Sequence, residues 1–154
     1  MFKIKTISII ISFFLFVGCG YKSSNTTDVN YYSIKKISID GNKRMGYLIK
    51  SEIMSESKNN LTRKLKITLV AKTNKKIKEK TISNKILKYE VSALVNVIIE
   101  DTETKKIVEK NYLRTADIYS TGNFADTLTG ERKKISLLSI EIAQEIIYFL
   151  KKKN

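Results

Sequence analysis

The spacing of apolar residues changes several times along this chain, and each change predicts a new element. Isoleucines within 31–40 indicate a first strand, and apolar residues at helical spacing over 44–57 are typical of an amphipathic helix. From Leu61 the period becomes two, which predicts a half-buried strand over 65–71. The lysine-rich stretch 72–86 is then expected to be the connection of a hairpin.

The second half of the chain goes again from strands to a helix. A long strand alternates regularly over 89–99, a tight turn spans 101–105, and a further strand is predicted over 107–116. A loop over 119–123 follows, with Asn123 as the expected N-cap of a helix that runs to Lys152. The predicted fold class is therefore α+β: a two-layer sandwich in which a four-stranded, largely antiparallel sheet carries two helices on one face, in the order β-α-β-β-β-α.

The first eighteen residues have the pattern of an export signal. Lys3 and Lys5 precede an apolar run over 7–17, which is eleven residues long. A membrane-spanning helix needs about 20 apolar residues, whereas the core of a signal peptide needs about 7–15. The run ends at Gly18 and Cys19, and this ending resembles the bacterial lipobox, in which the cysteine is acylated and the chain is cleaved before it.

This resemblance predicts 1–18 as a lipoprotein signal peptide, 19–30 as a lipidated tether and 31–154 as a single α+β domain. The alternative is that Cys19 is a buried structural residue that happens to follow an apolar stretch. Each buried acyl CH₂ contributes about 0.8 kcal/mol, so several chains give stable anchoring. Gly20, rather than aspartate, follows Cys19, which by resemblance to bacterial sorting rules directs the protein to the outer membrane.

The composition removes most forms of catalysis from consideration. The 154 residues include no histidine and one cysteine, so histidine triads, histidine metal sites, cysteine clusters and an internal disulfide are excluded. Acidic residues cluster at Glu100, Asp101 and Glu103, where a solvated turn is the simpler interpretation. We therefore expect no enzyme, no catalytic residue, no metal, and no cofactor other than a covalent lipid on Cys19.

Positive charge is concentrated in one segment. The net charge is +14, and residues 58–88 hold eleven basic residues against Glu79 alone, which is 11 − 1 = +10. The alternatives are an anionic partner, a solvated basic loop, or the bias of an AT-rich genome, although such a bias should spread along the chain. Because the chain carries an export signal, nucleic acid is not expected as a partner. Phosphorylated lipid headgroups, above all lipopolysaccharide, fit charge-assisted hydrogen bonds from lysine.

Several short motifs together resemble the lipopolysaccharide-assembly lipoprotein family LptE over 19–154. They are the start Cys19-Gly20-Tyr21, the element order, the segment Tyr112-Leu113-Arg114 followed by Tyr119, and Asn123-Phe124-Ala125 before a long terminal helix. The resemblance implies a protein that plugs the LptD β-barrel, helps to assemble it and assists delivery of lipopolysaccharide. It would be lipid-anchored at the outer membrane and face the periplasm or the barrel lumen.

The resemblance also implies where lipopolysaccharide would bind. One family contact falls in the connection before Tyr89, and a second falls early in the last helix. Partner-interface candidates are Tyr119 and Arg114. The lipopolysaccharide-binding candidates are Lys80, Lys85, Lys88, Arg132 and Lys133. The alternative function is that of another envelope lipoprotein, an accessory component of a lipid-transport or barrel-assembly complex.

Overall fold

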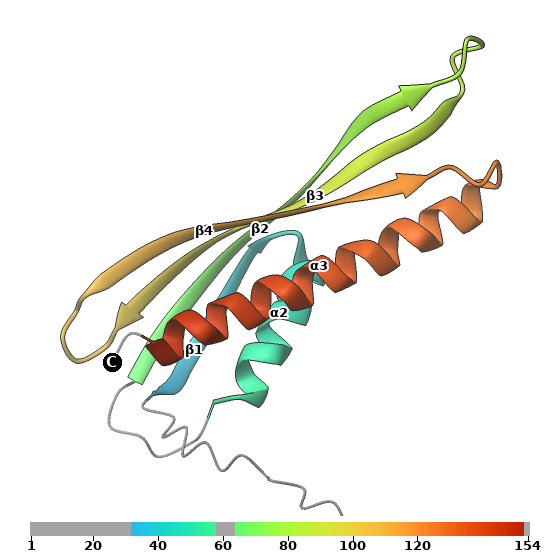
Figure 1. Ribbon diagram of the computed structural model, residues 1–154. Helices are drawn as coiled ribbons and strands as arrows, with labels where there is room; N and C mark the ends of the chain where they lie inside the picture. Colours follow the sequence, from blue (N-terminus) through green and yellow to red (C-terminus); the bar gives the residue numbers. More distant parts are fainter. Residues whose placement is uncertain (1–31, 58–63, 153–154) are drawn as a thin grey trace, which may run out of the picture.

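The chain forms a four-stranded sheet with both helices packed on one face (Figure 1). The computed structural model describes residues 32–57 and 64–152. The strands lie in the order β1-β2-β3-β4, with β1 parallel to β2 and the other pairs antiparallel. This arrangement confirms the predicted α+β class and its element order. The elements are β1 (Ser33–Gly41), α2 (Lys43–Ser55), β2 (Lys64–Lys80), β3 (Ile86–Asp101), β4 (Ile107–Tyr119) and α3 (Phe124–Lys152).

Some sequence-based predictions lie outside the described residues. They include the signal peptide 1–18, the lipid acceptor Cys19 and the tether 19–30, together with Lys58 and Arg63 of the basic segment. Lipidation of Cys19 therefore stays a prediction.

The core lies between the helices and alternate residues of the strands. Every second residue of β3 from Tyr89 to Asp101 is buried, as the alternating pattern predicts. The helices bury their apolar faces against this surface, with Ile49 and Ile53 of α2 and Ile146 of α3 fully buried. Complete burial of such a side chain contributes about 1.5–3 kcal/mol, so the helix–sheet contact stabilises the fold strongly.

Both helices begin at an asparagine that satisfies free backbone N–H groups. The Asn42 side chain accepts a hydrogen bond from the Met45 N–H at 3.1 Å, directly after Gly41, whose φ of +78° allows the sharp turn out of β1. The predicted N-cap Asn123 is confirmed, because its side chain accepts from the Ala125 N–H at 2.9 Å. The caps fix where each helix starts relative to the strand before it.

The prediction that 72–86 is a connection is wrong. β2 continues to Lys80 and stays paired with β3, from Lys72 opposite Leu94 to Ile77 opposite Tyr89, so only residues 81–85 connect the strands. Residues 72–80 are all exposed. Backbone hydrogen bonds pair them with β3, and this pairing does not require apolar and polar residues to alternate. The prediction that Tyr119 belongs to a loop is also wrong, because Tyr119 is the last residue of β4 and pairs with Lys88.

The β2–β3 hairpin extends away from the rest of the sheet, beyond the start of α3 (Figure 1). We call residues 76–87, at the far end of this hairpin, the hairpin tip. Ser33, near the start of the described domain, pairs with Lys64 at the other end of β2. β2 has 17 residues, and at about 3.3 Å per residue it spans about 55 Å. The described chain therefore starts at the end of the molecule opposite the hairpin tip.

Candidate functional site

The lysines predicted to contact an anionic ligand fall into two environments on the hairpin. Lys80 and Lys85 flank the tip turn, are exposed, and form no ion pair within the part of the chain that the structure describes. Lys88 is different, because its ammonium lies 2.8 Å from Asp117 and 5.2 Å from the centre of the Tyr119 ring. The hydrogen bond to Asp117 raises the pKa of Lys88 above its usual value. Lys88 is therefore committed to contacts within the chain, whereas Lys80 and Lys85 present free charges.

The two partner-interface candidates lie on opposite faces of β4. Tyr119 is 66% exposed at the end of the strand nearest the hairpin tip. Arg114 lies on the face covered by α3, where its guanidinium forms an ion pair with Glu145. Tyr119 is thus available to a partner, while Arg114 also has a structural role in holding α3 on the sheet.

Arg132 and Lys133 are exposed residues in the first half of α3. Arg132 lines a cleft of about 260 Å³ between α2 and α3, together with Arg44 of α2. Sequence reasoning missed Arg44, because nothing in the spacing of residues shows that these two helices bring two arginines to one cleft. The structure does not bring Arg132 into the same cavity as the hairpin lysines.

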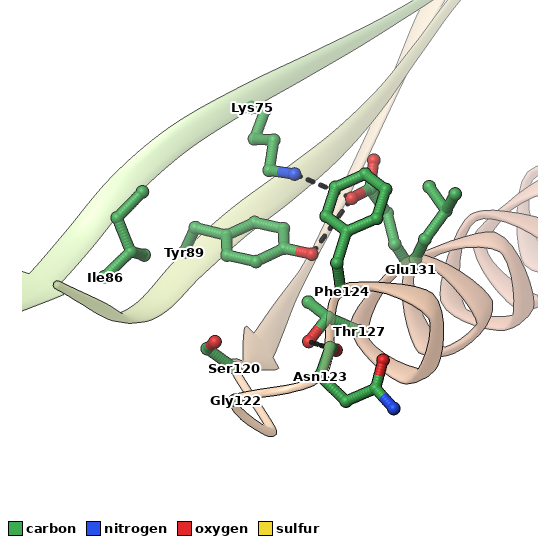
Figure 2. Close-up of a pocket in the computed structure, with 10 residues that line it drawn as sticks. Lys75, Ile86, Tyr89, Ser120, Gly122, Asn123, Phe124, Thr127 and Glu131 are labelled. Carbon is green, nitrogen blue, oxygen red and sulfur yellow. Dashed lines mark hydrogen bonds and ion pairs between the residues drawn. The ribbon is translucent and has the colours of Figure 1, made fainter.

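A larger cavity, of about 400 Å³, separates the hairpin from the β4–α3 loop and the first turns of α3 (Figure 2). Its centre is Glu131, whose carboxylate lies 2.7 Å from the Lys75 ammonium and accepts a hydrogen bond from the Tyr89 hydroxyl at 2.9 Å. The Lys75 ammonium also lies 3.8 Å from the centre of the Tyr89 ring. We call Lys75, Tyr89 and Glu131 the Glu131 clasp. It joins α3 to both strands of the hairpin.

The clasp changes the proton affinity of two of its members. Burial lowers the pKa of Lys75, but the hydrogen bond and negative charge of Glu131 outweigh this and raise it. Burial raises the pKa of Tyr89, and the hydrogen bond to Glu131 adds to the rise. Lys75 therefore stays charged and Tyr89 stays protonated across the neutral range, as their contacts with Glu131 require. Tyr89 is 3% exposed, in agreement with the alternating strand predicted over 89–99, but that pattern gave no indication of Glu131 as its partner.

The acidic cluster in the β3–β4 turn has a structural role. The Asp101 carboxylate accepts hydrogen bonds from the N–H groups of Glu103 and Thr104, at 3.0 and 3.1 Å, and so caps the turn. Glu100 lies 3.6 Å from Lys66 on the neighbouring strand. Within 32–57 and 64–152, no group of three or more potential ligands is arranged to hold a metal ion. Neither helix of this region combines the length and apolar character needed to cross a membrane.

Comparison with known proteins finds a similar fold in solved structures of bacterial lipoproteins. Neither a protein-family model nor a curated protein sequence matches the chain. The rare lipoprotein B of Shewanella oneidensis has a similar structure, with a TM-score of 0.57 and 10% identity over 75% of this chain and 92% of that one. A putative lipoprotein of Caulobacter crescentus has a TM-score of 0.52 and 12% identity, over 81% of this chain and 90% of that one. An uncharacterized lipoprotein B of Nitrosomonas europaea has a TM-score of 0.51 and 13% identity, over 76% of this chain and 80% of that one. At these identities the likeness shows a shared fold.

Proposed function

We propose that this protein is an envelope lipoprotein of the LptE type. It occupies and helps to assemble an LptD-like β-barrel in the outer membrane, and it assists delivery of lipopolysaccharide to the cell surface. Its action is binding rather than catalysis, and the lipid on Cys19 holds it at the membrane. The lipobox and the fold shared with solved lipoproteins support the envelope location.

The observation that carries the proposal is the concentration of unpaired lysines on a projecting hairpin. Most acidic side chains of the sheet are used in ion pairs, such as Glu90 with Lys78 and Asp117 with Lys88. Lys76, Lys80 and Lys85 have no such partner among the described residues and are exposed. Free ammonium groups on one strand and on the turn that follows it suit a ligand with several phosphates, as lipopolysaccharide has.

The remaining features suit a component held inside a barrel. A folded domain that exposes many charged side chains is compatible with the polar lumen of an outer-membrane barrel. A lipid anchor would raise the effective concentration of the domain at that membrane, so that a modest direct affinity is sufficient.

Charge reversal at the hairpin tests the binding part of the proposal. Lys80→Glu combined with Lys85→Glu should weaken lipopolysaccharide binding at least about tenfold, because each lysine near an anionic lipid surface contributes about 1 kcal/mol. The matched control is Lys105→Glu with Lys106→Glu, two exposed lysines in the turn at the opposite end of the sheet. Equal binding by both double variants, with circular dichroism showing both folded, would remove the hairpin lysines from the mechanism.

A further inference from the structure

The hairpin tip carries exposed apolar side chains as well as lysines. Ile82 at the turn is fully exposed, at 107% of its reference area, and Ile77, Ile86 and Leu87 are 44%, 40% and 46% exposed. Turns most often contain Gly, Pro, Asn, Asp or Ser, whereas this one carries an exposed isoleucine. These four apolar side chains lie within twelve residues of sequence, and Ile86 also lines the cavity next to the first turns of α3.

The turn itself is well formed, so the exposure of Ile82 does not come from a badly packed loop. The Thr81 N–H donates to the Lys85 carbonyl at 2.8 Å, and the Asn84 N–H donates to the Thr81 carbonyl at 2.9 Å. Asn84 adopts a φ of +61°, a conformation that asparagine tolerates well. The backbone of the turn therefore holds Ile82 outward in a fixed position.

Two aromatic side chains extend this apolar region onto the neighbouring loop. Tyr119 is 66% exposed and Phe124 is 80% exposed, on either side of the β4–α3 loop. The Ser120 N–H donates to the Leu87 carbonyl at 2.9 Å, which ties this loop to the hairpin. Six of the thirteen exposed large apolar side chains of the described residues therefore lie at this end of the molecule.

The charges around the apolar side chains have one predominant sign. The tip holds Lys76, Lys78, Lys80 and Lys85 against Glu79 alone, which is 4 − 1 = +3. The turn at the opposite end is different: 101–107 holds Asp101 and Glu103 against Lys105 and Lys106, and its charge is zero. Ile107 there is 65% exposed, so it offers a matched apolar residue without the positive surroundings.

We propose that the hairpin tip inserts into the interface of an anionic lipid layer. Ile82 and Leu87 enter the boundary between headgroups and acyl chains, while the lysines extend along the surface and bind phosphates. Apolar insertion and electrostatic attraction together are what hold peripheral segments at anionic membranes, and lysine can bury its stem while its charge stays in water. This inference rests on the proposed function only in placing the protein at a membrane.

The charge pattern favours a lipid layer over a protein groove. A protein groove that bound the four apolar side chains would also have to neutralise Lys76, Lys80 and Lys85 individually. A lipid surface supplies phosphates on every side and needs no fixed arrangement. Because the tip lies about 55 Å from the start of the described domain, it can engage a lipid layer other than the one that holds the anchor.

Fluorescence of a single introduced tryptophan tests the insertion, since the chain contains none. The full chain with Ile82→Trp is reconstituted in phosphatidylcholine vesicles and mixed with separate vesicles of phosphatidylcholine and phosphatidylglycerol whose acyl chains are brominated. The tryptophan emission should shift to shorter wavelength and be quenched. Acceptor vesicles of brominated phosphatidylcholine alone should give little quenching. The control Ile107→Trp should show neither effect.

A second set of variants separates insertion from simple attraction. Adding Lys80→Glu and Lys85→Glu to Ile82→Trp should remove most of the quenching, whereas adding Lys105→Glu and Lys106→Glu should leave it. Absence of quenching in the folded Ile82→Trp variant, or equal quenching of the Ile82→Trp and Ile107→Trp variants, would overturn the inference. These vesicles contain neither barrel nor lipopolysaccharide, so a negative result here leaves the proposed function standing, and loss of the barrel partner leaves the insertion standing.

Discussion

Glu131 gives the sharpest energetic prediction, because one carboxylate links α3 to both strands of the hairpin. Its side chain is 18% exposed and accepts from the nearly buried Tyr89 hydroxyl at 2.9 Å. A hydrogen bond to a charged group contributes about 1.5–3 kcal/mol. The ion pair with the half-exposed Lys75 adds only about 0.2–1 kcal/mol, because water screens it.

Glu131→Ala should therefore lower the free energy of unfolding by about 2–3 kcal/mol, after a small gain from the helix propensity of alanine. A double-mutant cycle in urea unfolding apportions this loss. The coupling of Glu131→Ala with Tyr89→Phe should be about 1.5–3 kcal/mol, and the coupling with Lys75→Met should stay below about 1 kcal/mol.

The cycle can refute this reasoning in two ways. A coupling to Tyr89 near zero would show that the hydroxyl finds an equally good partner in water. A coupling to Lys75 larger than that to Tyr89 would show that screening does not weaken the ion pair. Either result would mean that the clasp does not hold the hairpin on α3 in the way the contacts indicate.

Two further predictions concern glycine and alkaline pH. Gly46→Ala should destabilise the protein by about 1–3 kcal/mol, because the added Cβ would collide with the Ile39 side chain where α2 meets β1. Gly130→Ala, in open space on α3, should stabilise the protein by up to about 1 kcal/mol. Equal effects of the two substitutions in thermal unfolding would contradict this reasoning. Burial raises the pKa of Tyr112 above 10.0 as it does that of Tyr89. The folded state therefore favours the protonated tyrosines. The free energy of unfolding should keep its full value below about pH 10 and decrease as the pH rises above that value. Urea unfolding at about pH 8 and pH 11 measures this, and an unchanged stability would contradict it.

The sequence was most informative where burial imposes a period on the side chains. The alternation from Tyr89 to Ile99 and the helical spacing after Asn123 correctly predicted β3 and α3, because one face of each is covered. Residues 72–80 gave no such signal, since β2 pairs there through its backbone while both faces meet water. The pattern therefore predicted a connection where the structure has a strand.

The candidate site shows the same division. The charge count alone located the basic hairpin, because its lysines are concentrated along the chain. The Glu131 clasp and the pair of Arg44 with Arg132 could not be predicted, because each joins residues distant in sequence through the packing of α3. The exposure of Ile82 was also missed, because it depends on the geometry of the turn that holds the side chain outward.

The most direct test of the proposed function is the identity of the partner. The tagged full chain is extracted from outer membranes in mild detergent, with a Cys19→Ala variant as the control for anchoring, and co-eluting proteins are identified by mass spectrometry. The proposal predicts an LptD-like barrel in stoichiometric amount with the lipidated protein. Recovery without any barrel, or with a lipid-transport or barrel-assembly complex instead, would contradict the LptE-type function and favour an accessory envelope lipoprotein.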